Sequence, residues 1–169
     1  MPQVSIRRAE GADDLAAIRA LCRDWVDWQL ATLPEHREAI LTRFEPVAYA
    51  RELDELPVIH ARPRGLMLLA TLDDRPVGCV MYHPHDPAMP GMAEIKRLFV
   101  RPDGRGHGIG RALLEAMFEG MRGDGYDRVR FASARFLPHA RALYERVGFV
   151  DIPALPGTPP IAYWMERAL

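Results

Sequence analysis

Residues 93–117 read AEIKRLFVRPDGRGHGIGRALLEAM. Apolar residues dominate 93–100 and predict a β-strand. Apolar side chains then recur at helical spacing over 108–122, which predicts an amphipathic helix. Between these two segments lie three alternating glycines, Gly106, Gly108 and Gly110. The stretch therefore predicts a strand that feeds a glycine-rich turn and opens directly into a helix.

The glycine-rich turn has the features of an anion site. Glycines let the backbone approach a ligand closely, and the first N–H groups of a helix point outward at the positive end of its dipole. Such a terminus binds phosphate groups, and Arg105 and Arg111 flank it here. The spacing fits neither the phosphate loop GxxxxGK(S/T), since no Lys-Ser or Lys-Thr pair follows, nor the dinucleotide form GxGxxG, since the glycines alternate. We therefore expect phosphate binding without P-loop kinase or hydride-transfer chemistry.

The remaining sequence predicts strands and helices that interleave. Strands are expected at 4–8, 66–72, 76–82, 129–132, 149–152 and 161–165, and helices from 13 or 14 to 33, in short pieces between 35 and 56, and over 139–147. Asp13 or Asp14 is the expected N-cap of the first helix, and Pro57 the expected end of the short helices. The strands at 66–72 and 76–82 are too close in sequence for a parallel crossover, so they should pair antiparallel. The fold class is therefore α/β (α+β) with a mixed sheet.

Composition limits the classes of protein that need to be considered. The chain has 169 residues and a formal net charge of −1, so we expect one domain over residues 1–169 and neither nucleic acid nor a membrane as a partner. The sequence has no apolar stretch of the roughly 18 residues that a membrane span needs and no signal-peptide core, which predicts a soluble cytoplasmic protein. Cys22 and Cys79 lack metal or redox spacing and are expected to be buried thiols.

Two motifs in the second half of the chain resemble those of the GNAT superfamily of acyl-CoA-dependent N-acyltransferases. Residues 105–110, Arg-Gly-His-Gly-Ile-Gly, are similar to its pyrophosphate signature, R/Q-x-x-G-x-G/A. Residues 140–149, ARALYERVGF, resemble the family element A-x-x-L-Y-x-x-x-G-F. The resemblance covers about residues 93–152, and the order of the other predicted elements is compatible with it. The two motifs together are specific, whereas either one alone would not be.

The resemblance implies a fold and a cofactor site. A GNAT-like sheet is mixed, twisted and mostly antiparallel, has six to seven strands flanked by helices, and splits between strands four and five. Acetyl-CoA would lie in this split as co-substrate, with its pantetheine paired to the backbone of Leu98, Phe99 and Val100. Many members have an asparagine seven residues before the motif tyrosine, where this chain has Leu137 and so lacks that polar group. The pyrophosphate would contact the turn and the helix start, namely Arg105, Gly106, His107, Gly108, Ile109, Gly110 and Arg111.

Glu94 is the candidate base. An alkyl ammonium group titrates near ~10.4, so a base or a proton path helps to supply the neutral amine at pH 7. Glu94 lies eleven residues before Arg105, where some family members place a catalytic glutamate. The alternative is that Glu94 balances the charges of Lys96 and Arg97. Strand alternation puts Glu94 and Lys96 on one face unless a bulge intervenes.

Tyr144 is the second catalytic candidate. The resemblance implies that it protonates the leaving thiolate or forms a hydrogen bond to the cofactor sulfur. The alternative is a packed core tyrosine, since Leu143, Val147 and Phe149 are its neighbours in the sequence.

Three further features carry weaker expectations. The segment 83–86, His-Pro-His-Asp, contains groups that zinc accepts, but its prolines predict a surface loop and it has no partner cluster, so no metal is expected. His107 is interpreted as a spacer in the turn rather than a base. Trp25 and Trp28 share a helix face and are interpreted as core aromatics, with a wall of the acceptor pocket as the alternative.

The expected activity is acetyl transfer by direct attack of a primary amine, with no nucleophile from the chain and with backbone N–H groups stabilising the oxyanion. We expect a small-molecule acceptor. The alternatives are a non-catalytic acyl-CoA-binding regulatory module and a protein N-terminal or lysine acetyltransferase. The acceptor pocket would come from residues 1–65 and the C-terminal bend, which carry no recognisable signature. The sequence does not specify the oligomeric state, and a homodimer is compatible with it.

Overall fold

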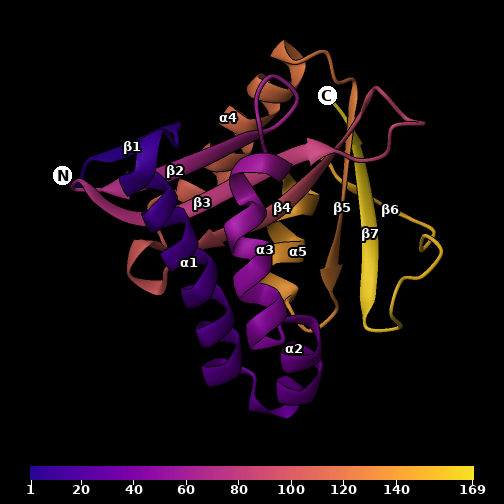
Figure 1. Ribbon diagram of the computed structural model, residues 1–169, viewed down its shortest axis with the longest axis horizontal. Coiled ribbons are helices and arrows are strands. Elements are labelled where there is room, and N and C mark those ends of the chain that lie inside the picture. Colours follow the sequence, from indigo (N-terminus) through magenta and orange to yellow (C-terminus); the bar gives the residue numbers. More distant parts are fainter.

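The computed structural model describes residues 1–169, except for the side chain of Pro138. A seven-stranded sheet runs through the centre of the molecule, and helices lie on both of its faces (Figure 1). We call the face that carries the N-terminal helices the front face and the opposite one the back face. The front face carries α1 (Gly11–Thr32), α2 (Arg37–Arg43) and α3 (Pro46–Ile59), and the back face carries α4 (Ile109–Gly123) and α5 (Pro138–Arg146).

The sheet is mixed, as the sequence predicts. Its strand order is β1-β2-β3-β4-β5-β7-β6, and β4 and β5 are parallel neighbours while the other neighbours are antiparallel. The turn between β2 and β3 uses Asp73 and Asp74 with φ of 49° and 63°, as a type I′ hairpin turn requires. The strands are β1 (Val4–Arg8), β2 (Leu66–Leu72), β3 (Arg75–Pro84), β4 (Met92–Val100), β5 (Arg128–Ala134), β6 (Val150–Ile152) and β7 (Ala162–Ala168).

The sheet opens between β4 and β5. The parallel register pairs residues 92–94 of β4 with residues 128–130 of β5, and beyond this point the two strands diverge (Figure 1). Residues 95–100 of β4 therefore run beside β3 on one side and along the opening on the other. This is the split that the resemblance implies between strands four and five, and the fold prediction is confirmed.

A β-bulge interrupts β4 beside this opening. Lys96 pairs with Met81 and Phe99 with Cys79, so three steps along β4 match two along β3. Arg97 has a φ of 57° at the bulge, which is uncommon for a residue with a Cβ atom. The bulge follows Lys96, so it leaves the alternation that places Glu94 and Lys96 on one face undisturbed.

Each face of the sheet has its own apolar core. Residues of α4 and α5 pack on the back face with Phe131 of β5, and residues of α1 and α3 pack on the front face with Met81 of β3. Cys22 and Cys79 are buried free thiols of the front core, as predicted. In Figure 1 the front helices lie over β1 to β4, while β5, β6 and β7 extend beside them.

The start of α1 differs from the prediction. The helix begins at Gly11 with Glu10 as its N-cap, and neither Asp13 nor Asp14 takes that position. Asp14 lies inside the first turn, where it accepts the Glu10 backbone N–H at 2.8 Å and forms an ion pair with Arg7. Its carboxylate therefore satisfies an N-terminal N–H group from within the helix rather than from the cap.

The prediction that Pro57 ends the front helices is also wrong, since α3 continues to Ile59. A proline inside a helix removes the hydrogen bond to the carbonyl four residues earlier, here that of Leu53. Arg19 of α1 donates from Nε to this carbonyl at 3.1 Å. The contact between α1 and α3 thus satisfies the group that Pro57 leaves without its helical partner.

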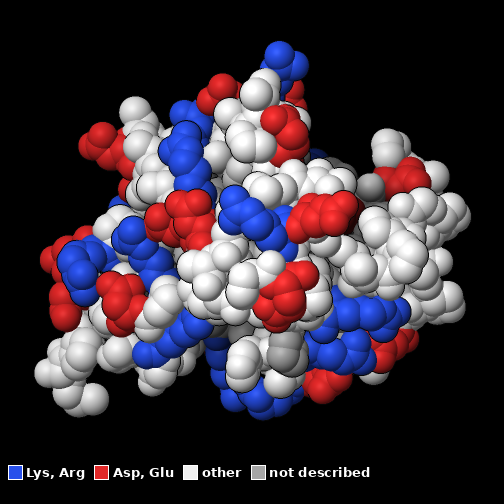
Figure 2. Space-filling model, turned by 90° about the horizontal axis from the view of Figure 1, so that it is seen from below, with Lys and Arg blue, Asp and Glu red and all other residues white. Residues whose placement is uncertain are grey.

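Charges of both signs cover the surface. In the view of Figure 2, basic and acidic side chains are interspersed, so neither sign forms an extended field on that face. Within the part of the chain that the structure describes, no helix is both long and apolar enough to cross a membrane.

Candidate active site

The glycine-rich turn lies at the end of β4. The 3₁₀ turn Pro102–Gly104 follows this strand, and α4 begins after Gly108, its N-cap. Gly106 and Gly108 have φ of 83° and 73°, and a Cβ added at either would meet no atom within 4 Å. Backbone conformation rather than lack of space therefore requires these two glycines. At Gly110 an added Cβ would lie 3.2 Å from Leu143 Cδ2, so this glycine lets α4 approach α5.

Arg105 joins the turn to α1. Its Cζ lies 4.5 Å from the centre of the Trp28 ring, and its Nε donates to the Val100 carbonyl at 3.2 Å. Burial lowers the pKa of Arg105 from its usual value. Both tryptophans of α1 pack against the front core, as predicted, and in addition Trp25 meets Phe44 edge-on while Trp28 supports an arginine of the turn.

The side chains of the other predicted phosphate contacts take three different positions: one is exposed, one folds back on the turn and one is buried. Arg111 is exposed, and its Nε forms an ion pair with Glu115 one turn along α4 at 2.7 Å. His107 folds back on the turn, with Nδ1 3.0 Å from the Arg105 carbonyl, which agrees with its interpretation as a spacer. The side chain of Ile109 is buried in the back core, so this residue has only its backbone to offer a ligand.

The three predicted pantetheine residues follow the opening into the turn. Phe99 packs into the front core, while Leu98 and Val100 pack against the back core. Alternate side chains thus fix this part of β4 from both faces. Residues 98–100 and 105–111 lie on one continuous segment of backbone, 98–111, and we call these two groups of residues the cofactor edge.

Tyr144 lies on the back face against β5. Its ring stacks on Phe131 with the two centroids 3.8 Å apart, and it meets Phe149 edge-on at 5.5 Å. Burial raises the pKa of Tyr144 well above its usual range, so the hydroxyl keeps its proton at neutral pH. The packing matches the core alternative, and the protonated hydroxyl is compatible with a role as hydrogen-bond donor.

Glu94 is the last residue of β4 that pairs with β5. Lys96 Nζ lies 2.5 Å from its Oε1, and His85 Nδ1 lies 2.8 Å from its Oε2. Burial acts to raise the pKa of Glu94, but the charge of Lys96 and the hydrogen bonds from Lys96 and His85 bring it below its usual value. Glu94 is therefore an ionised carboxylate with both oxygens engaged, and Lys96 is the charge partner that the sequence suggests.

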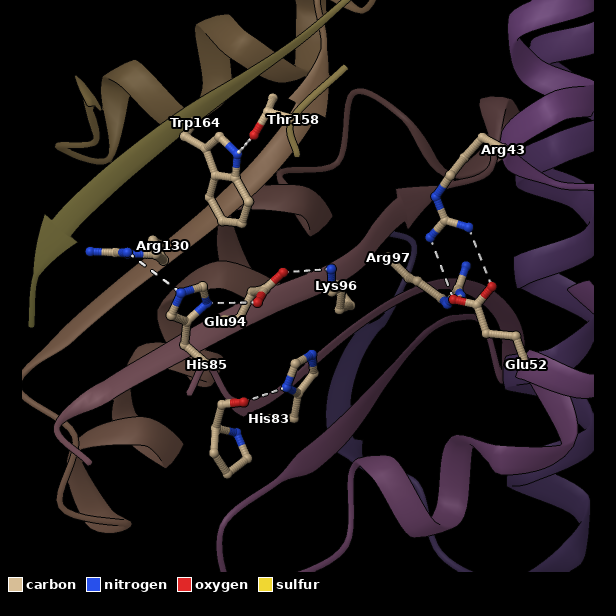
Figure 3. A network of polar contacts seen from close by, with 11 residues as sticks. Arg43, Glu52, His83, His85, Glu94, Lys96, Arg97, Arg130, Thr158 and Trp164 are labelled. Atoms are coloured by element: carbon tan, nitrogen blue, oxygen red, sulfur yellow. Dashed lines mark hydrogen bonds and ion pairs between the residues drawn. The ribbon is translucent and has the colours of Figure 1, made fainter. Parts of the chain in front are cut away.

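The polar contacts of Glu94 continue across the opening (Figure 3). His85 Nε2 lies 3.5 Å from an Arg130 guanidinium nitrogen, and Arg130 forms an ion pair with Glu166 at 2.6 Å. Because arginine only donates, this geometry fits the neutral imidazole of His85 with its proton on Nδ1. The Trp164 ring lies edge-on to His85 with the centroids 5.8 Å apart. Side chains from β4, β5 and β7 therefore meet on the front face. We call this group the acceptor cluster; its members are His83, His85, Glu94, Lys96, Arg130, Trp164 and Glu166.

A second group of charges ties the β4 bulge to α3. The Arg97 guanidinium is buried, donates to the Tyr49 hydroxyl at 3.0 Å and forms an ion pair with Glu52. Glu52 also pairs with Arg43 at 3.3 Å. Burial acts to raise the pKa of Glu52, whereas Arg43 and Arg97 bring it below its usual value. These contacts hold the unusual backbone of Arg97 in place beside the opening.

The segment 83–86 is only in part the surface loop that its prolines predict, since Asp86 is exposed in the loop after β3 whereas His83 and Pro84 belong to the strand. Strand β3 continues through Pro84, and the following residue, His85, turns its largely buried side chain to Glu94. His83 stands opposite Glu94 in the β3–β4 register and is half-buried. The described side chains include no group of three His, Cys, Asp or Glu that could hold a metal ion.

Sequence reasoning missed most of the acceptor cluster. His83 had a usable signal, because it continues the alternation of the buried front-face residues Cys79 and Met81. Arg130 and Trp164 had no comparable signal, since their proximity depends on how β5 and β7 follow β4 in the sheet.

Comparison with known proteins gives relatives with partial coverage. An IAA acetyltransferase of Azospirillum brasilense is 37% identical over 81 residues, which are 47% of this chain and 53% of that protein. An uncharacterised N-acetyltransferase of Schizosaccharomyces pombe is 35% identical over 91 residues, 53% of this chain and 55% of that protein. The chain thus spans about half the length of these curated relatives.

Solved structures match over nearly the whole chain. An acetyltransferase from Streptococcus agalactiae has a TM-score of 0.74 at 18% identity, with 98% of both chains covered. The PaiA N-acetyltransferase from Thermoplasma acidophilum, solved in complex with coenzyme A, has a TM-score of 0.73 at 20% identity, with 99% of both chains covered. The model of the Acetyltransferase (GNAT) family matches residues 23–149, which is more than half of the sequence. With its split sheet and glycine-rich turn, this chain belongs to the GNAT family of acetyltransferases.

Proposed function

We propose that this chain is an N-acetyltransferase that moves the acetyl group of acetyl-CoA to a primary amine of a small molecule. The observation that carries the proposal is the opening between β4 and β5, where the cofactor edge and the acceptor cluster meet on the same strand. Family membership supports the reaction, and the matched structure solved with coenzyme A supports the cofactor.

The cofactor edge fits a thioester of coenzyme A. Acetyl-CoA supplies the acetyl group in an activated form. The N-terminus of α4, with Arg105 and Arg111 beside it, would hold the pyrophosphate, and the backbone of residues 98–100 would hold the pantetheine. Gly106 and Gly108 have positive φ values, and no protein atom lies within 4 Å of the position that a Cβ would take at either residue. The turn therefore leaves room for phosphate groups to approach its backbone closely.

The acceptor cluster fits an amine. In this proposal Glu94 attracts the ammonium group and, as predicted from the sequence, takes its proton directly or through water. Lys96 releases one carboxylate oxygen for this purpose, and the side chain of Lys96 is exposed enough, at 37%, to move away. Tyr144 keeps its proton and donates a hydrogen bond to the sulfur of the leaving group.

A non-catalytic acyl-CoA-binding module is the second candidate. Two observations favour it: both oxygens of Glu94 are already engaged, and Leu137 stands where many family members have an asparagine. The protein acetyltransferase alternative would need an open acidic groove for a basic substrate. The acceptor cluster carries both signs of charge, which suits a small acceptor better.

A screen of amines with acetyl-CoA tests the proposal. The purified chain is incubated with acetyl-CoA and single amines, amino acids or basic peptides, and free thiol and acetylated product are measured against reactions without acceptor. Amine-dependent thiol release with equal amounts of acetyl-amine would support transfer to small molecules. Acetylation confined to peptides would point to the protein alternative. A thermal shift with acetyl-CoA and no product from any acceptor would favour the non-catalytic module.

A further inference from the structure

Three imidazoles near Glu94 differ in what their Nδ1 atoms contact. His85 Nδ1 bonds the Glu94 carboxylate, whereas His60 Nδ1 lies 2.9 Å from the Tyr82 carbonyl and His83 Nδ1 lies 2.6 Å from the Pro84 carbonyl. A carbonyl oxygen only accepts hydrogen bonds, so the protons of His60 and His83 belong on Nδ1. Their Nε2 atoms then carry a free lone pair, while that of His85 faces Arg130.

His83 combines this lone pair with access to the acceptor cluster. It pairs with Glu94 in the register of β3 and β4 and points to the same face. Its side chain is half-buried, and its second ring nitrogen is turned away from the carbonyl that Nδ1 contacts, toward the side where Lys96 lies (Figure 3). His60 lies behind it with the ring centroids 5.4 Å apart and is only 4% exposed, so a substrate cannot reach it.

We propose that His83 is a catalytic base of acetyl transfer, with Nε2 accepting a proton of the acceptor amine directly or through one water. This inference rests on the proposed function and changes one step of it, because His83 rather than Glu94 takes the proton. Glu94 then attracts the ammonium group and holds Lys96 and His85, and the proton that it draws in passes to His83.

The partly buried position of His83 favours its neutral, proton-accepting form. Burial has the largest effect on the pKa of His83 and lowers it, the hydrogen bond to the Pro84 carbonyl and the charge of Glu94 act to raise it, and Lys96 acts to lower it, with the net result below the usual imidazole value. The remaining close ring, His60, is also neutral at pH 7, because burial lowers its pKa to about 4. Glu94 is the weaker base of the two candidates, since its pKa lies below that of an ordinary carboxyl. A proton acceptor nearer to neutrality is the better general base at pH 7.

The proton balance of the reaction needs one such acceptor. The ammonium form of the acceptor loses one proton, which His83 takes and later passes to solvent. The nitrogen lone pair forms the C–N bond as the C–S bond breaks. The second proton leaves the nitrogen and ends on the sulfur, so the products are the amide, the free thiol and one released proton.

The test compares the same substitution at two neighbouring histidines. His83→Asn keeps a donor for the Pro84 carbonyl but removes Nε2, and His85→Asn keeps a donor for Glu94. For an amine that the wild type acetylates, we expect His83→Asn to lower kcat at pH 7 by roughly 10²- to 10⁴-fold. His85→Asn should lower it by less than about tenfold, because the proton acceptor remains.

Two further readouts separate a base from a structural residue. Wild-type kcat should fall as the pH drops through a value below about 6.5, because a protonated imidazole cannot accept, and His83→Asn should lose this limb. Added imidazole should restore part of the activity of His83→Ala but not that of Glu94→Gln. If the His83 variants fail to fold, the wild-type profile decides: a kcat that is flat from pH 7 down to 4.5 would overturn the inference.

The test distinguishes a failure of the role assigned to His83 from a failure of the proposed function. If the wild type acetylates an amine and folded His83→Asn matches it, or the two Asn variants lose activity equally, the role of His83 is wrong and the proposed function stands. If the wild type acetylates no acceptor, the proposed function itself is wrong and the assignment of His83 fails with it.

Discussion

The cofactor edge and the acceptor cluster share one strand, β4, but they are built in opposite ways. The cofactor edge is a single run of backbone whose shape depends on glycines with positive φ and on the start of α4. The acceptor cluster is a set of side chains, all ionisable except Trp164, that β3, β4, β5 and β7 bring together. Changes of backbone shape or of charge at the cofactor edge should therefore alter the affinity for acetyl-CoA. Neutralising a charged side chain of the acceptor cluster, or changing the pH, should alter kcat.

The largest effect is expected at the cofactor edge, from Gly108→Asp. Asp tolerates the φ of 73° at this N-cap better than most residues, so the fold should persist, but its carboxylate would face the pyrophosphate. Two like charges about 4 Å apart repel by about 4 kcal/mol at an effective dielectric of 20, so acetyl-CoA affinity should fall by about 10³-fold. Isothermal titration measures this loss.

Gly108→Asn is the matched control, because it has nearly the same shape without the charge and also tolerates this backbone. It should retain most of the affinity. Equal losses for Asp and Asn would mean that space rather than charge limits the site, and the contrast between the two regions would weaken.

Glu94→Gln tests the other region with the next largest effect. We expect kcat at pH 7 to fall by roughly 10²- to 10⁴-fold with acetyl-CoA affinity unchanged, since the substitution removes a charge without altering the cofactor edge. The loss should shrink at high pH, where more of the amine is neutral. Glu119→Gln, at an exposed position of α4, is the control and should behave as the wild type. Unchanged turnover in Glu94→Gln would leave this residue as a charge partner of Lys96.

The same contrast explains what can be predicted from the sequence. The cofactor edge is contiguous, so its glycines and the amphipathic helix that follows them are visible as a motif, and the split beside β4 follows from the resemblance. The acceptor cluster is not contiguous: Arg130 meets His85 only because β5 is placed next to β4. Local signals also failed where tertiary contacts compensate, as at Pro57: it has no N–H for the Leu53 carbonyl, and Arg19 donates to that carbonyl instead.

Stability should depend on pH through His60, behind the acceptor cluster. Burial lowers the pKa of His60 to about 4, whereas an exposed imidazole titrates near 6.5. The unfolded chain therefore takes up a proton first as the pH falls from about 6.5, and the folded chain follows only near 4. The free energy of unfolding should fall over this interval by about 3 kcal/mol from this residue alone, and the contribution is fully present above pH 6.5.

Denaturant unfolding of the wild type and His60→Gln between pH 7.5 and 4 isolates this contribution. Subtracting the two curves of unfolding free energy against pH cancels the contribution of the carboxyl groups, because they titrate in both proteins. The stability of the wild type should converge toward that of the variant as the pH falls. A constant difference over the whole interval would show that His60 does not titrate differently in the folded state, and the pH sensitivity of this region would have to lie elsewhere.

The smallest effect is expected for Tyr144→Phe, at a residue that lies on the back face and that we propose as a hydrogen-bond donor to the cofactor sulfur. The exchange keeps the ring that stacks on Phe131 and meets Phe149, so folding should be preserved. Because burial raises the pKa of Tyr144, its hydroxyl is a weaker acid than a thiol, and complete proton transfer to the leaving sulfur is uphill. A hydrogen bond to a charged group contributes about 1.5–3 kcal/mol, so kcat should fall by about 10- to 100-fold.

A second acetyl donor decides what this hydroxyl does. A donor whose thiol is more acidic places less charge on sulfur that must be stabilised, so the loss in Tyr144→Phe should shrink with it if the donor binds equally well. An equal loss with both donors would mean that the hydroxyl positions the cofactor, and full activity with acetyl-CoA would make Tyr144 a core residue only. In that last case the cofactor edge would hold the cofactor with its backbone and its arginines, and the acceptor cluster would be the part of the site whose side chains transfer protons.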